Sequence, residues 1–186
     1  MISLSTVSLA AGLALAILSA PALLFPDLAR KWCGAFPRNT AAAWVLTAID
    51  LAWAATLLYS SPMLAGVEWA RRLCLVLAPV AFFLIVFFID ELLAARALGG
   101  LLVLVPRPVL DAAFINTSDW KLVMTALSYI VVVAGIVLIL SPFRFRQVTG
   151  IVMKTNGRSR LAGAMGLSTG ILVLVLALTV YRTVNT

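Results

Sequence analysis

One carboxylate in the middle of an apolar run is the residue best placed to do chemistry. Residues 40–60 carry no other charged side chain, and Asp50 stands about ten residues from either end of the run. At 1.5 Å per residue, Asp50 would lie roughly 15 Å deep in a membrane-spanning helix. A charge there costs about 2.5–3.5 kcal/mol. The acid must therefore be protonated, paired, or turned toward protein or water.

Helical spacing places Asp50 on a stripe of small residues. Thr47 and Ala43 precede it and Ala54 follows it at intervals of three or four. Small faces let helices approach closely, so we expect Asp50 to face another helix, with Thr47 as a neighbouring hydroxyl. Two later spans offer candidate surfaces for it, namely Ser128 and Tyr129 near the middle of one, and the glycine stripe Gly163, Gly166 and Gly170 of the other.

Two interpretations of Asp50 remain open. It is either a proton or cation site, or a clamp in which a neutral acid donates a hydrogen bond to a hydroxyl or carbonyl of another helix. Proton paths usually need several polar groups in series, and no other acid or base is clearly central in a span, so we favour the clamp. A second cluster, Asp90, Glu91 and Arg96, is more typical of a solvated helix end.

The composition places the chain in lipid. Of 186 residues, 63% are hydrophobic and 11% are charged, whereas soluble domains are about half apolar and a quarter charged. The sequence has no histidine, and its two cysteines, Cys33 and Cys74, lack metal-binding spacing. We therefore expect no metal, no cofactor and no enzymatic activity. The net charge of +7 is better explained by residues flanking membrane spans than by nucleic acid.

The predicted fold is an all-α polytopic integral membrane protein with five or six transmembrane helices in a single domain. Five spans are clear, at about 3–24, 40–60, 73–93, 119–141 and 161–181. Segment 97–110 is harder, because Pro106 and Pro108 interrupt it. It is re-entrant, interfacial, or a short crossing, and a longer crossing would start at Leu92 and include Arg96.

Two basic connections set the predicted topology. Residues 26–39 read as an interfacial loop or short amphipathic helix, and residues 141–160 read as a basic loop without acids. Both should face the cytoplasm or its organelle equivalent, which requires an even number of crossings between them and so favours six spans over five. A duplicated helical hairpin around a central irregular segment is one reading of this pattern; the other is that any hairpin with a basic loop looks alike. The residues assigned to lipid headgroups and topology are Arg30, Lys31, Arg38, Arg144, Arg146, Lys154, Arg158 and Arg160.

Two functions compete at this stage. The leading one is a non-catalytic membrane subunit, or an accessory or assembly protein, of a larger membrane complex, with lipids and other membrane subunits as partners. The rival is a small oligomeric transporter or channel for protons or a small solute, with Asp50 in the path. A subunit predicts a dry helix contact at Asp50, and a transporter predicts a wet cavity. The bacterial inner membrane is the default location, and an organelle membrane is the alternative.

Overall fold

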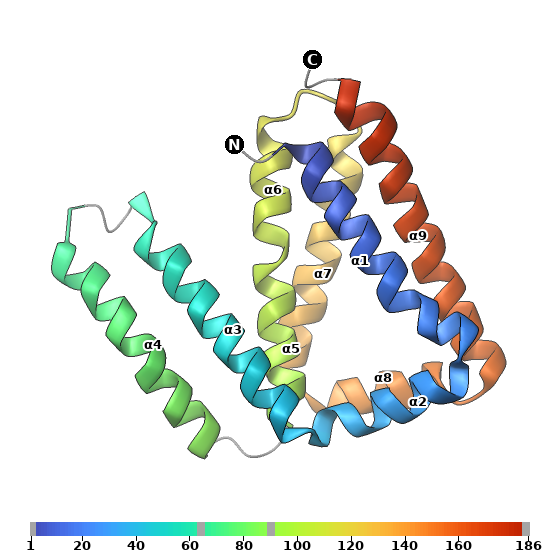
Figure 1. Ribbon diagram of the computed structural model, residues 1–186, viewed down its shortest axis with the longest axis horizontal. Helices are drawn as coiled ribbons and strands as arrows, with labels where there is room; N and C mark the ends of the chain where they lie inside the picture. The colour runs from blue at the N-terminus through green and yellow to red at the C-terminus, as the bar shows by residue number, and fades with distance from the viewer. Residues whose placement is uncertain (1–2, 63–65, 89–91, 184–186) are drawn as a thin grey trace.

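The computed structural model describes residues 3–62, 66–88 and 92–183, which form helices and connections with no strand among them (Figure 1). This confirms the all-α prediction for the described residues. Six helical segments are long and apolar enough to cross a membrane. They are α1 (Leu4–Leu24), α3 (Thr40–Tyr59), α4 (Glu68–Phe88), α5 (Leu93–Leu104) continued by α6 (Pro106–Ile115), α7 (Lys121–Leu140) and α9 (Asn156–Thr183). Of the two predicted counts, six is the one the structure supports.

The boundaries agree with the predicted spans except at two helices. Helix α4 begins at Glu68 instead of residue 73, and α9 begins at Asn156 instead of residue 161. Both extra turns are polar, since a helix can continue past the apolar layer into water. An acid such as Glu68 is also favourable at a helix N-terminus. The end of the predicted third span includes residues 89–91, which lie outside the described residues.

Segment 97–110 belongs to a full-length candidate span. The segment from Leu93 to Ile115 has 23 residues and is long and apolar enough to cross a membrane, which favours the longer crossing over a re-entrant, interfacial or short element. Pro106 begins α6, where its missing N–H does no harm. Val105 before it keeps a right-handed helical conformation, and its N–H donates to Leu101 O at 2.9 Å. The prolines therefore divide the helix into two stacked pieces (Figure 1).

Two short helices cross one end of the bundle, opposite the end where both chain termini lie (Figure 1). Helix α2 (Pro26–Ala35) is followed by the 3₁₀ turn η1 (Phe36–Arg38), and α8 (Phe143–Val152) occupies the second basic connection. Residues 26–39 were predicted to form either an interfacial loop or a short helix, and the structure has the short helix. Residues 141–160 were predicted to form only a basic loop, so α8 was not expected. The order span, short helix, span therefore occurs twice, as a duplicated hairpin would require; the duplication itself stays a prediction.

The main bundle is held by helices that approach closely at glycines. A Cβ added at Gly163 would stand 2.7 Å from Leu23 N, so α9 touches the backbone of α1 there. Gly99 and Gly135 do the same between α5 and α7, where a Cβ on either would lie under 3 Å from the other's carbonyl oxygen. At the terminal end, buried Tyr181 donates from its hydroxyl to Trp120 O at 2.7 Å.

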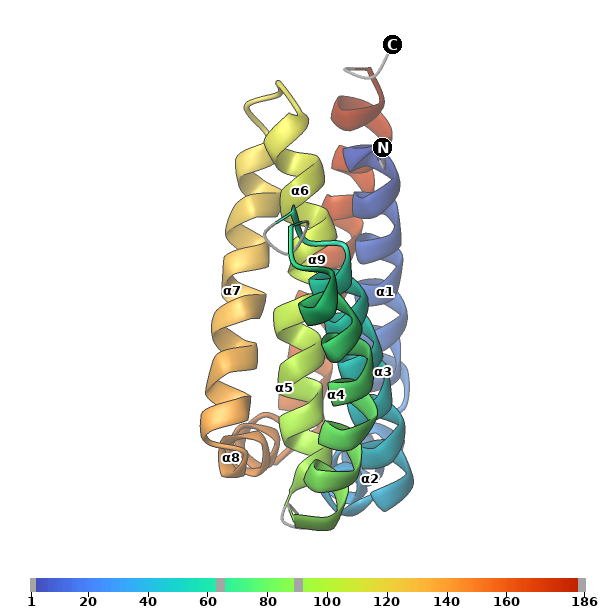
Figure 2. The same cartoon turned by 90° about the vertical axis from the view of Figure 1, so that its left-hand side faces the viewer.

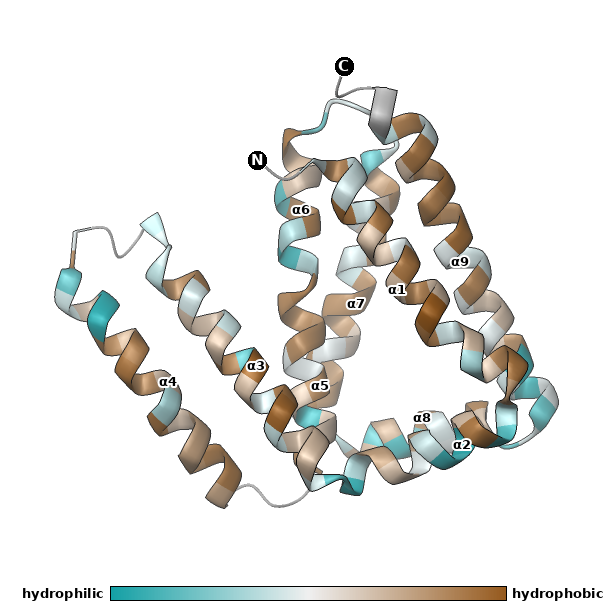
Figure 3. Cartoon of the chain, viewed as in Figure 1, coloured by the Kyte–Doolittle hydropathy of each residue, from teal (hydrophilic) through white to brown (hydrophobic). Residues whose placement is uncertain are grey.

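The α3–α4 hairpin projects from one side of this bundle (Figure 1) and lies in front of it when viewed from that side (Figure 2), while α3 packs on α5. Helix α4 packs mainly on α3, and of the six candidate spans it has the smallest buried share. Trp69, Phe83 and Phe87 on α4 are all more than half exposed. Hydrophobic residues predominate along the candidate spans and many of them are exposed, while hydrophilic residues are frequent on α2, α8 and the connections (Figure 3). This distribution fits a multi-pass membrane protein, because lipid tails solvate such surfaces.

The α1/α9 contact predicts opposite effects for two Gly→Ala substitutions in one helix. Gly163→Ala should lower stability by about 1–3 kcal/mol, because its methyl group would collide with the backbone of α1. Gly157→Ala in the first turn of α9 should leave stability unchanged or raise it by up to about 1 kcal/mol, because nothing lies within 4 Å of its Cβ. Thermal loss of the monodisperse species in detergent measures both. Equal effects of the two substitutions would contradict the close contact.

Candidate functional site

Asp50 lies on α3 and packs against α5. Its neighbour is Gly100, and a Cβ added there would stand 2.6 Å from Asp50 Oδ2. The carboxylate thus occupies the space that any larger residue at position 100 would fill. Two adjacent glycines in an apolar helix were the sequence signal for this contact. They lie about 100° apart around α5, so that Gly99 faces α7 while Gly100 faces Asp50.

The polar groups around Asp50 do not form a hydrogen-bonded clamp. Asp50 Oδ1 is buried and has no hydrogen-bond partner among the described residues. Thr47 is buried one turn away, but its hydroxyl donates to Ala43 O of its own helix at 2.8 Å. The contact between α3 and α5 is therefore one of close packing around a carboxylate, and Thr47 is satisfied without it.

The other predicted candidates lie elsewhere in the bundle. Ser128 on α7 is buried, whereas the neighbouring Tyr129 is 60% exposed and lines a shallow hollow between α6 and α7. The glycine stripe of α9 faces α1: the closest neighbours of Gly163, Gly166 and Gly170 include backbone or side-chain atoms of Leu23, Ser19 and Ala16, respectively. The stripe packs helices, as expected for its residue type, but it is not the surface that receives Asp50.

Arg96 is the residue that sequence reasoning assigned to the wrong environment. It is half-buried, and its Nε atom is buried without a hydrogen-bond partner among the described residues. It precedes Gly100 by four residues and so shares the face of α5 that meets α3. Asp90 and Glu91, grouped with it in the sequence, lie outside the described residues. One helix interface therefore carries a carboxylate and a guanidinium, each with an unpaired buried atom.

The interface offers no ready metal site. In the described parts of the chain, no three His, Cys, Asp or Glu side chains come together as metal ligands would. A single carboxylate beside a glycine can hold a helix contact, accept a proton, or pair with a cation. Of these, the observed geometry is that of a helix contact.

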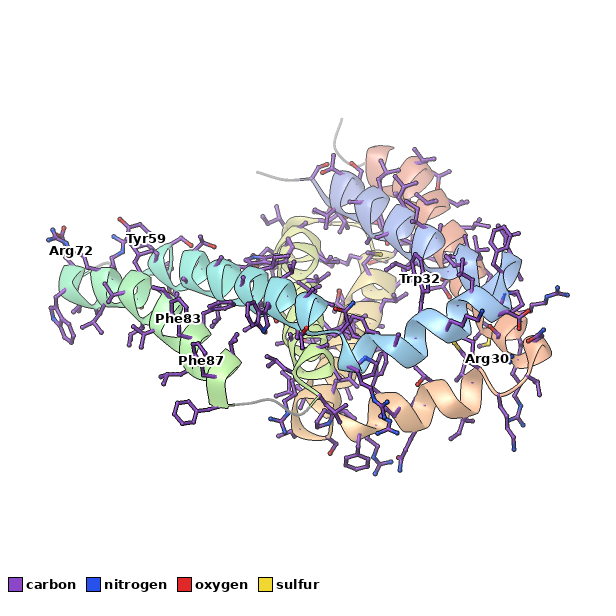
Figure 4. All side chains as sticks on the ribbon, turned by 60° about the horizontal axis from the view of Figure 1, so that its bottom comes forward. Arg30, Trp32, Tyr59, Arg72, Phe83 and Phe87 are labelled. Atoms are coloured by element: carbon purple, nitrogen blue, oxygen red, sulfur yellow. The ribbon has the colours of Figure 1, made fainter. Side chains whose placement is uncertain are left out.

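The predicted headgroup residues are gathered at the end of the bundle crossed by α2 and α8 (Figures 1 and 3). Arg30 Nη2 donates to Asn156 Oδ1 at 2.5 Å, and Arg30 Nη1 lies 3.9 Å from Asp27 Oδ1. Burial raises the pKa of the Cys33 thiol, which lies in this region on α2. Lys31, Arg38, Arg144, Arg146, Lys154, Arg158 and Arg160 are exposed. Arg71 and Arg72 lie near the start of α4, and Figure 4 shows Arg72 far from Arg30.

Comparison with known proteins gives no relative from which a role could be transferred. No family model matches the chain, and neither the curated proteins nor the solved structures yield a match. The residues at the α3/α5 interface and at the basic end must therefore be interpreted from their own geometry and charge.

The Asp50–Gly100 contact predicts a strong coupling between two substitutions. Gly100→Ala alone should lower stability by about 1–3 kcal/mol, because the new methyl group would displace the carboxylate. Asp50→Ala should relieve most of that loss, since it vacates the space. A double-mutant cycle by thermal unfolding in detergent should then give a coupling of about 1–3 kcal/mol. Additive effects would show that the two residues do not meet.

Proposed function

We propose that this chain is a non-catalytic integral-membrane subunit, or an accessory or assembly protein, of a larger membrane complex, located in the bacterial inner membrane. The observation that carries this proposal is the environment of Asp50. Its carboxylate packs into the gap left by Gly100 on a neighbouring helix, which is the arrangement of a structural contact. A subunit needs such contacts and needs no solute path.

The α3–α4 hairpin supports a partner within the membrane. Helix α4 contacts α3 on one side, while Phe83 and Phe87 stack with ring centroids 6.4 Å apart on its exposed surface. Both labelled rings project from α4 in Figure 4. Lipid could cover this surface, but an arm projecting from a bundle also leaves space for a partner helix on each side. Helix α4, which packs mainly on α3 and has the smallest buried share of the six candidate spans, is well suited to contact another chain.

The short connections point the same way. The longest stretch between described helices, from Ser60 to Val67, contains eight residues, of which 63–65 lie outside the described part. The described connections thus offer little surface to a soluble partner or substrate. Binding to other proteins would have to use the membrane-embedded faces and the basic end.

The rival function remains a small oligomeric transporter or channel for protons or a small solute. One observation favours it, namely that Asp50 and Arg96 place buried, unpaired polar atoms on one interface. Intramembrane ionisable residues often mark ion paths. Separation of α3 from α5 would expose both groups to a path between the helices, and a second copy of the chain could complete such a path.

The basic end should face the cytoplasm. Helices α2 and α8 carry four of the eight predicted headgroup cations at one end of the bundle, and positively charged connections are retained in the cytoplasm. A reporter enzyme active only in the periplasm should therefore be active when fused after residue 186 and inactive when inserted after residue 154. The reverse pattern would overturn the orientation, and activity at both positions would overturn the six-span topology.

Purification from the native membrane in a gentle detergent tests the proposed function. We expect companion proteins in fixed stoichiometry, identified by mass spectrometry. Phe83→Ala/Phe87→Ala should release them, whereas Phe114→Ala should not, because Phe114 is exposed but lies on α6 within the main bundle.

A homogeneous homo-oligomer without companions would contradict the subunit proposal. Proton and solute flux in liposomes would then be compared between the unchanged protein and Asp50→Asn. Loss of flux in that variant would establish the transporter, because Asn keeps the size of the side chain and removes its charge.

A further inference from the structure

The two short helices at the basic end enclose a groove. Helices α2 and α8 lie side by side there (Figures 1 and 4), and the groove between them has a volume of about 410 Å³. Its walls are Arg30, Cys33 and Gly34 from α2, Arg146, Thr149 and Gly150 from α8, and Met153 and Lys154 just beyond. Phe36 and Phe145 join the two sides at one end, with ring centroids 5.5 Å apart.

Three cations from separate elements converge on this groove, and none of the described residues that line it is an acid. Arg30 comes from α2, Arg146 from α8, and Lys154 from the connection to α9. The nearest described acid is Asp27, whose carboxylate lies 3.9 Å from Arg30 and is itself 73% exposed. Like charges brought together by a fold repel one another, and a bound anion would remove that repulsion.

The groove has the chemistry and room for a phosphate group. Arginine forms paired hydrogen bonds with phosphate oxygens, and lysine adds a point charge. Gly34 and Gly150 stand on the two walls, and nothing lies within 4 Å of where their Cβ atoms would be. An anion could therefore approach the backbone from both sides. The volume falls in the range of ordinary small-ligand sites, about 300–1,000 Å³.

The surroundings of the groove indicate where the phosphate comes from. By helical spacing, Leu28 and Trp32 lie on the side of α2 opposite the groove residues, and Val148 and Ile151 lie on the opposite side of α8. All four side chains are exposed. Helices with one apolar and one basic face lie in the membrane surface with the apolar face in lipid. The groove would then open at the level of lipid headgroups.

We propose that the groove between α2 and α8 binds the phosphate of an anionic phospholipid headgroup, held by Arg30, Arg146 and Lys154. The site is independent of the α3/α5 interface and of the proposed subunit role. It makes the basic end a specific lipid site in addition to a topology signal.

Titration of the delipidated protein in neutral detergent tests this site. The probes are phosphatidylglycerol, phosphatidylcholine and inorganic phosphate. We expect phosphatidylglycerol to bind, and Arg146→Gln/Lys154→Gln to raise its dissociation constant about tenfold or more, as for lost hydrogen bonds to a charged group. The matched control, Arg144→Gln/Arg158→Gln, removes two cations from the same end that do not line the groove. It should have a much smaller effect.

The position of the bound lipid can be checked through Cys33. In a Cys74→Ser background, phosphatidylglycerol should slow maleimide labelling of Cys33, which lines the groove, and phosphatidylcholine should not. Equal losses in the two double variants would overturn the proposal, as would equal binding of phosphatidylcholine. The lipid assignment would be overturned in favour of a soluble phosphate if inorganic phosphate bound as tightly as phosphatidylglycerol and if Arg146→Gln/Lys154→Gln abolished that binding. All four substituted side chains are exposed, and circular dichroism would show that the variants remain folded.

Discussion

Close approach of helix backbones at glycine is the interaction on which this bundle depends. Lipid tails are as apolar as leucine, so burial alone gives transmembrane helices little reason to associate, and tight packing has to do so. Glycines of α9 meet α1, Gly99 and Gly135 join α5 to α7, and Gly100 receives Asp50 from α3. Helix α4 contains no glycine, and among the candidate spans it lies outermost, beyond α3 (Figure 1).

Helix α5 has a special position in this arrangement because it packs on two neighbours at adjacent residues. Gly99 and Gly100 turn toward α7 and α3 respectively, so the α3–α4 hairpin is joined to the bundle largely through α5. Any movement of the hairpin must therefore change the surroundings of Asp50 and of Arg96 on the same face. The contact of Asp50 with Gly100 can therefore both stabilise the packing of α3 on α5 and couple movements of the α3–α4 hairpin to the bundle.

Much of the fold could be predicted from the sequence because hydrophobic runs and charge bias are local signals. The spans, their number and the shared side of the basic connections all follow from length, charge and the positive-inside rule. The partner of Asp50 could not be predicted, since several helices offered small surfaces and pairing depends on tertiary geometry. Helix α8 was missed because its Arg, Gln and Thr residues resemble a loop in composition. The environment of Arg96 was left open because Pro106 and Pro108 downstream obscured a helical segment that is long enough to cross a membrane.

The basic end differs from the rest of the molecule in what holds it together. Elsewhere helices approach closely at glycines, whereas here the ring of Phe36 in η1 contacts that of Phe145 in α8, and Arg30 of α2 donates to Asn156 at the start of α9. Between these points lies a groove with three cations. Helix α2 joins α1 to α3, and helix α8 joins α7 to α9. An anion bound between α2 and α8 would therefore connect these two helix pairs across that end. A lipid phosphate bound at the headgroup level would then hold α2 and α8 together, just as close contacts at glycines hold the spans together within the bundle.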